Sequence, residues 1–147
     1  METIIFIVIA FIAGVFQPIQ GGVNAELRLK TKSPYLSGAI SNLLGALLMI
    51  LFALFINGKN LEIPKFEPSH WWIWTGGIFS LIIVVSTIIL PTKISYTTFF
   101  GTFITGQLIM ATLIDRFAIF GGDVIEITTK RILGIVFLLV GVYLVKK

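Results

Sequence analysis

The sequence contains no cysteine and a single histidine, and only 12% of its 147 residues are charged. Without thiols the chain cannot form disulfides, carry out thiol redox chemistry or build a cysteine-ligated metal centre. The lone His70 cannot provide a histidine metal site by itself. Soluble domains are ordinarily about one quarter charged. We therefore expect no metal, no cofactor and no water-soluble fold.

Motifs for catalysis and for nucleic-acid binding are also missing. The sequence has no glycine-rich phosphate loop followed by Lys-Ser or Lys-Thr, and no candidate set of serine, histidine and aspartate residues for nucleophilic catalysis. Nucleic-acid binding requires basic residues that are clustered on one face. The 11 lysines and arginines of this sequence lie between apolar segments and are not clustered in this way. The sequence predicts that the protein is not an enzyme and has no nucleic-acid partner.

Long apolar windows dominate what is present. Hydrophobic residues make up 56% of the chain, and the mean hydropathy is +1.01. Four charge-free windows reach the length of roughly 17–25 residues that a membrane-spanning helix needs, and a shorter fifth is flanked by lysines and arginines whose stems extend it. The sequence predicts an all-α integral membrane protein in contact with the lipid bilayer. It predicts one transmembrane domain over residues 1–147, with helices at about 3–25, 34–58, 71–90, 94–114 and 128–145.

Polar residues follow one face of the first predicted helix. Gln17, Gln20 and Asn24 are spaced by three and four residues, which places their side chains on the same side of a helix. Pro18 lies among them and removes one backbone donor, so we expect a kink that serves as a hinge. Amides in a kinked, glycine-rich membrane helix are typical of a transport path. The alternative is that they form hydrogen bonds between helices.

Two further amides lie deep in the predicted spans, Asn42 in the second helix and Gln107 in the fourth. We predict that both contact the transported substrate. No aspartate or glutamate lies inside any of the five windows, which disfavours proton-coupled exchange of organic cations and favours a neutral or anionic solute. At the end of the fourth helix, Asp115 and Arg116 are expected to form a pair that orients this helix.

The positive charges are divided almost equally between the two sides of the membrane. Five crossings would place five lysines and arginines on one side and six on the other, whereas a fixed orientation requires a clear excess on the cytoplasmic side. Such a chain can insert both ways, so we expect an antiparallel homodimer, and a separately encoded partner is the alternative. The first group is Lys59, Lys65, Arg116, Lys130 and Arg131, and the second is Arg28, Lys30, Lys32, Lys93, Lys146 and Lys147.

Two stretches carry a resemblance to a known family. The run from Gly14 to Arg28, with its Pro-x-Gln-x-x-x-Asn element, and the run from Gly106 to Gly121, with its Gly-Gln and following Asp, resemble the YdcZ-like family. These proteins are half-size members of the drug/metabolite transporter superfamily. The resemblance implies a five-helix half of an inverted-repeat transporter that acts as an exporter in the bacterial cytoplasmic (inner) membrane.

The last helix is similar to the terminal helix of small multidrug resistance proteins, where two glycines seven residues apart let partner helices approach closely. The resemblance implies that Gly134 and Gly141 form a dimer contact. A shorter stretch, Thr97 to Phe103, faintly resembles small fluoride channels, which are also dual-topology dimers. The leading hypothesis is a secondary transporter of a small polar solute. A small ion channel and a non-transporting scaffold subunit remain the alternatives.

Overall fold

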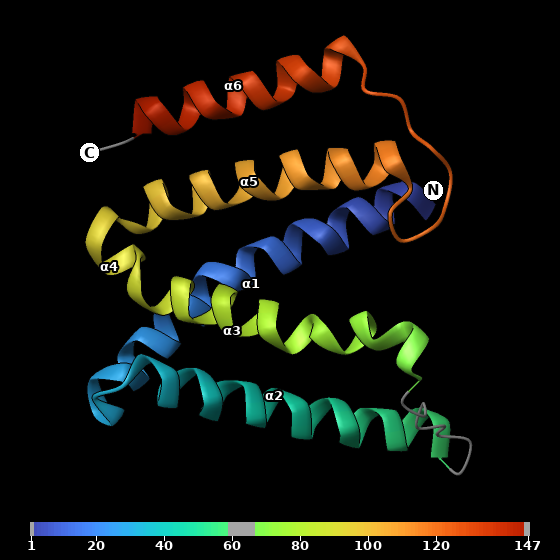
Figure 1. The fold of residues 1–147 in the computed structure, drawn as a ribbon. Coiled ribbons are helices and arrows are strands. Elements are labelled where there is room, and N and C mark those ends of the chain that lie inside the picture. The colour runs from blue at the N-terminus through green and yellow to red at the C-terminus, as the bar shows by residue number, and fades with distance from the viewer. Residues whose placement is uncertain (1, 59–66, 146–147) are drawn as a thin grey trace. The chain divides into compact units, whose positions relative to one another are not determined.

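The computed structural model describes residues 2–58 and 67–145, and within these ranges every regular element is a helix (Figure 1). The chain divides into two compact units, Met1–Ile89 and Leu90–Lys147. Four of the lysines counted for the topology lie outside the described residues, namely Lys59, Lys65, Lys146 and Lys147.

The first unit opens with two long helices, α1 (Glu2–Thr31) and α2 (Pro34–Asn57). The predicted end of the first helix near residue 25 is wrong, because α1 continues to Thr31 and carries its charged residues inside its last turns. Basic side chains there interact favourably with the carboxyl end of the helix. The turn that follows is short, since Ser33 caps α2 by accepting a hydrogen bond from the Leu36 N–H at 3.2 Å, and Pro34 occupies the first helical position.

The third predicted helix is divided into two elements. A 3₁₀ segment, η2, covers Pro68–Thr75, and α3 follows over Gly76–Ile89. The helices α1, α2 and α3 all contact one another. Small residues permit the close contacts, because a Cβ added at Gly38 of α2 would lie 3.0 Å from Val84 Cγ1 of α3. Ile88 at the end of α3 is completely buried.

The second unit consists of the short α4 (Pro91–Ile94), α5 (Tyr96–Phe117) and α6 (Thr129–Val145). The helices α5 and α6 form an antiparallel hairpin (Figure 1). Ser95 caps α5 with a positive φ of 67°, and Ala118 ends it in the left-handed conformation at φ 47°. The hairpin is tight, because a Cβ added at Gly101 would lie 2.8 Å from Val142 Cγ2.

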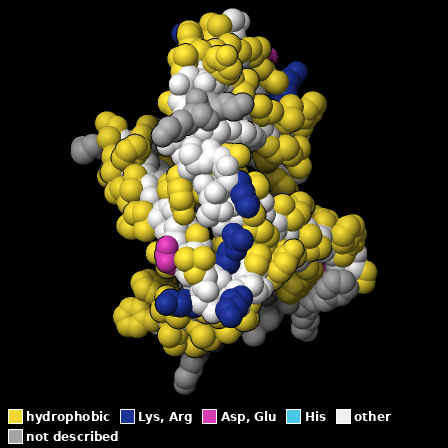
Figure 2. Space-filling model, turned by 90° about the vertical axis from the view of Figure 1, so that its left-hand side faces the viewer, with side chains coloured by type: hydrophobic (Ala, Val, Ile, Leu, Met, Phe, Trp, Pro, Cys, Tyr) yellow, Lys and Arg dark blue, Asp and Glu magenta, His cyan; other side chains and the backbone are white. Residues whose placement is uncertain are grey.

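The surface of the molecule is apolar. Large hydrophobic side chains are exposed along the described helices, and hydrophobic side chains cover much of the face that Figure 2 shows. Within the described ranges, four segments are long and apolar enough to cross a membrane. The helix α6, at 17 residues, is shorter, so its crossing stays a prediction. An all-helical chain with an apolar exterior is an integral membrane protein, because the bilayer requires internally satisfied backbone groups and accepts apolar side chains. The four segments are Thr3–Thr31, Pro34–Asn57, Pro68–Ile94 and Tyr96–Phe117.

Candidate functional site

An open groove runs along the middle of α1 and carries two of the predicted amides. Gln17 is half-buried and Gln20 is exposed, and both line this groove of about 610 Å³. Neither side chain has a hydrogen-bond partner among the residues that the structure describes. An amide in hydrocarbon without a partner costs several kcal/mol. The groove therefore presents unmet hydrogen-bonding groups at membrane depth. Its other lining residues are Ala13, Gly14, Phe16 and Ile19.

Pro18 adds to the polarity of the same groove. The helix α1 continues through this residue without interruption. Since proline has no backbone N–H, it cannot donate to the carbonyl oxygen four residues earlier, which belongs to Gly14. Gly14 lines the groove and has no side chain to cover that oxygen. The groove thus combines two amides with a carbonyl group that lacks its usual helical donor.

Asn24, the third amide of the predicted face, has a different environment. It is 3% exposed, and its backbone carbonyl accepts a hydrogen bond of 2.6 Å from Ser37 Oγ of α2. Asn24 is not among the residues that line the α1 groove. The structure therefore brings Gln17 and Gln20 together and places Asn24 at the contact between α1 and α2.

Asn42 lines a separate, smaller cleft between α2 and α3. Its amide nitrogen donates to Ser80 Oγ of α3 across 3.5 Å, a long and weak hydrogen bond. Ser80 is a polar partner that the sequence analysis missed, although a serine within an apolar window was visible. The cleft has a volume of about 230 Å³ and is lined by Tyr35, Gly38, Ala39, Asn42, Gly77, Leu81, Val84 and Val85.

In the second unit, the remaining predicted substrate contact, Gln107, is exposed on α5. The two glycines of α6 also have open surroundings. A Cβ added at Gly134 or Gly141 would meet no atom within 4 Å, so neither glycine is needed for a close approach within the described part of the chain. The glycine that allows α5 and α6 to pack closely is Gly101.

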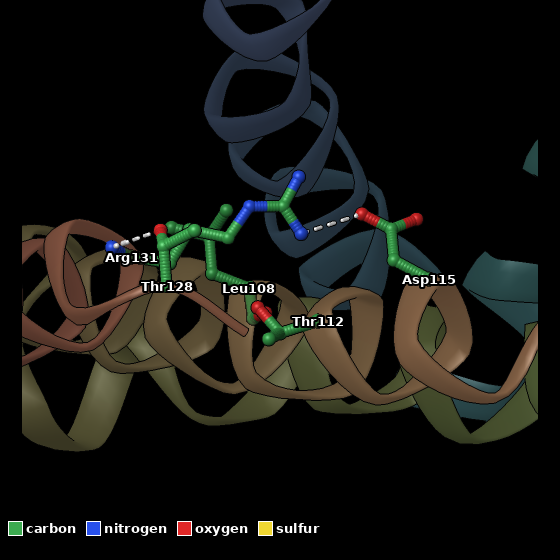
Figure 3. A network of polar contacts seen from close by, with 5 residues as sticks. All are labelled: Leu108, Thr112, Asp115, Thr128 and Arg131. Carbon is green, nitrogen blue, oxygen red and sulfur yellow. Dashed lines mark hydrogen bonds and ion pairs between the residues drawn. The ribbon is translucent and has the colours of Figure 1, made fainter. Parts of the chain in front are cut away.

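An ion pair joins α5 and α6 at the loop end of their hairpin (Figure 3). Arg131 Nη1 donates to Asp115 Oδ2 at 3.0 Å, and the two side chains are 37% and 39% exposed. The backbone carbonyl of Asp115 also accepts the Ile125 N–H at 3.0 Å, which fixes the loop against α5. Asp115 is therefore paired with Arg131, which the hairpin brings beside this carboxylate, while an orienting role of Asp115 and Arg116 stays a prediction.

The ion pair borders a cleft of about 290 Å³ between α5 and α6. The hydroxyl of Thr112 donates to the Leu108 carbonyl at 2.8 Å and is thereby satisfied within α5. Apolar and small residues form most of the remaining wall. The lining residues are Leu108, Ala111, Thr112, Asp115, Arg131, Gly134, Ile135 and Leu138.

Exchanging the two charges is expected to raise the stability of the protein. Asp115 lies near the carboxyl end of α5 and Arg131 in the first turn of α6, so each charge opposes the dipole of its own helix. The double variant Asp115→Arg with Arg131→Asp keeps an ion pair between the two positions. It also makes the interaction of each charge with the dipole of its own helix favourable, and each such interaction is worth roughly 0.3–1 kcal/mol. We expect a midpoint of thermal unfolding in detergent above that of the wild type and of Asp115→Arg alone. A swapped protein no more stable than the single variant would show that the pair does not form.

A family model described as "Putative inner membrane exporter, YdcZ" matches residues 5–144. The match covers nearly all of both units and every candidate site residue named in this subsection. No curated protein and no solved structure matches the chain.

Proposed function

This chain belongs to the YdcZ family of inner membrane exporters, and from that premise we propose that two copies of it form one export path for a small polar solute. It is a multi-pass protein of the bacterial inner membrane. The observation that carries the proposal is the groove on α1, where Gln17 and Gln20 line an open volume of about 610 Å³ without partners among the described residues.

The chemistry of the groove favours a polar solute that both donates and accepts hydrogen bonds. Each glutamine side chain offers two donor protons and one acceptor oxygen, and the carbonyl of Gly14 adds a further acceptor. None of the described residues that line the groove is charged. A neutral solute can replace the water around these groups without bringing an uncompensated charge to membrane depth. That Asn24, Asn42 and Gln107 also contact the solute, and that Pro18 acts as a hinge, stays a prediction.

The size of the chain, the distribution of its basic residues and the exposed glycines of α6 support a dimer. A half-size protein requires a second half to enclose a path, and the nearly equal numbers of basic residues on the two sides permit the opposite orientation of that half. The exposed glycines of α6, Gly134 and Gly141, offer a surface on which a partner helix can approach closely. We propose that the second half is another copy of this chain in the antiparallel orientation.

One preparation tests both parts of the proposal. The chain has no cysteine, so the variant Asp123→Cys carries a single thiol in the exposed loop between α5 and α6. We expect a membrane-impermeant maleimide to label about half of the protein from each side of the membrane in cells and proteoliposomes. Solutes that raise the midpoint of thermal unfolding of the purified protein identify ligands by mass action. We expect these solutes to show saturable counterflow in the same proteoliposomes.

The outcomes separate the alternatives. Labelling from one side alone would rule out the antiparallel homodimer and leave a separately encoded partner as the second half. Unitary currents without counterflow would show a channel. A preparation that binds and moves none of the neutral polar solutes tested, while remaining a dimer, would identify a scaffold subunit and overturn the proposal.

A further inference from the structure

A cleft at the other end of the α5–α6 hairpin, where α5 begins, combines a positive charge with an apolar wall. Its volume is about 690 Å³. The cleft is formed entirely by the second unit and contains none of the residues proposed for the export path. Lys93, Ser95, Thr98 and Thr102 make it polar on one side, and Ile94, Leu139, Val142 and Tyr143 provide its remaining wall.

The positive charge of Lys93 is not neutralised within the described residues. This side chain is exposed, and no carboxylate of the described chain lies within ion-pair distance of it. Lys93 is the last residue but one of the candidate span Pro68–Ile94, shortly before the span Tyr96–Phe117 begins, and this position corresponds to the membrane surface. A lysine at that level attracts anionic headgroups.

A pair of hydroxyl groups lies at the same end of the cleft. Ser95 Oγ and Thr98 Oγ1 are 3.0 Å apart, and Ser95 Oγ also accepts the Thr98 N–H at 3.3 Å. Two hydroxyls have two protons, and one of them bridges the two oxygens. The second proton has no acceptor among the described residues, and Thr98 is only 8% exposed. The polar end therefore offers an ammonium group and a hydroxyl donor to an anion.

The apolar wall limits the identity of that anion. Leu139 and Val142 of α6 lie along the cleft beyond the hydroxyls, and the Thr102 hydroxyl is already satisfied by the Thr98 carbonyl at 2.9 Å. A free inorganic anion would leave this wall empty. A molecule with an anionic head and a hydrocarbon tail matches both ends, and the bilayer supplies such molecules at this depth. We propose that this cleft binds an anionic phospholipid, with its phosphate at Lys93 and an acyl chain along Leu139 and Val142.

Native mass spectrometry of the purified full chain, with added phosphatidylglycerol or phosphatidylcholine of identical acyl chains, tests the proposal. We expect tighter binding of phosphatidylglycerol to the wild type. Lys93→Gln should weaken it roughly fivefold, which corresponds to about 1 kcal/mol. Lys93→Arg should retain the preference. The control is Lys130→Gln, which removes an exposed lysine at the opposite end of the hairpin and should leave phosphatidylglycerol binding unchanged.

A second variant tests the apolar half without changing any charge. Leu139→Trp places a larger side chain in the space proposed for the acyl chain. We expect it to weaken phosphatidylglycerol binding although Lys93 is unchanged. Equal binding of the two lipids by the wild type would overturn the proposal, and so would loss of the preference in Lys130→Gln. Binding of glycerol 3-phosphate with the affinity of the lipid would show a site for small anions instead. Because these measurements require no transport, their failure is distinct from a failure of the export path.

Discussion

Replacement of Gln17 and Gln20 together by methionine is expected to lower counterflow at least about tenfold. Methionine has nearly the shape and length of glutamine but no amide, so the change removes hydrogen bonds to the solute with little change of volume. Each lost hydrogen bond is worth about 1 kcal/mol, and a factor of ten in rate corresponds to about 1.4 kcal/mol. The measurement is the initial rate of counterflow in proteoliposomes that contain equal amounts of protein.

The matched control for this variant is Ile19→Met, which alters an apolar residue of the same groove. It should leave the counterflow rate nearly unchanged. The oligomeric state of the double variant in detergent must be measured alongside. If the dimer dissociates together with the loss of counterflow, the two glutamines hold helices together and are not contacts to the solute. Full activity in the double variant would remove the groove from the path.

Substitution of Gly101 by alanine is expected to destabilise the α5–α6 hairpin. The new Cβ would lie 2.8 Å from Val142 Cγ2, closer than side-chain carbons approach one another. Val142 is β-branched and has few alternative rotamers, so the clash must be relieved by separating the helices. Overpacking of this kind costs about 1–3 kcal/mol. We expect a lower midpoint of thermal unfolding in detergent.

A second substitution and a neighbouring glycine make this experiment specific. Val142→Ala removes the methyl groups that Gly101→Ala would strike, so the double variant should be more stable than the sum of the single effects predicts. Gly106 lies on the same helix, and a Cβ there would meet no atom within 4 Å. Gly106→Ala should therefore be neutral or stabilising. Equal effects of alanine at the two glycines would contradict the close approach of α5 and α6.

The positions of the helices could be predicted because hydrocarbon excludes charge along the length of each span. The predicted helix ends were wrong at the ends of the spans, where charged side chains can reach water. Glu26, Arg28 and Lys30 interrupt the first apolar window, yet α1 continues to Thr31, because charged side chains at a helix end reach water without ending the helix. The third predicted helix, at about 71–90, begins three residues too late, because the 3₁₀ segment η2 starts at Pro68, which occupies a first-turn position where its missing N–H costs no hydrogen bond.

The candidate site was predictable only in part. The spacing of residues along a helix predicts which side chains share one face, but it does not predict which neighbouring helix packs against that face. Gln17, Gln20 and Asn24 share one side of α1 by their spacing, and two of them line the open groove. Asn24 differs because α1 and α2 meet near the turn that joins them and diverge away from it (Figure 1). The same side of the helix is therefore covered at one level and open at another.

The pairing of Asp115 with Arg131 could not be predicted from neighbouring residues. The two side chains are 16 residues apart and meet only because α6 returns along α5. The sequence showed two basic residues at the start of the last apolar window, Lys130 and Arg131. It gave no direct indication of which of them would face the carboxylate, since that depends on the rotation of α6 about its own axis.

The distribution of side chains between interior and surface determines which substitutions this protein tolerates. Among the described residues, the buried polar side chains are small, and the buried apolar ones are few: Ile88, Pro91, Phe99 and Phe100. The many apolar side chains on the outside contact fluid acyl chains, which adapt to their shape. Exchanges of one aliphatic residue for another on that surface should accumulate freely during evolution. Sequence constraint then falls on small inward residues such as Ser37, Gly38 and Thr105. The interior is the constrained part in water-soluble proteins too, but here the variable surface is apolar and the interior carries the polar side chains.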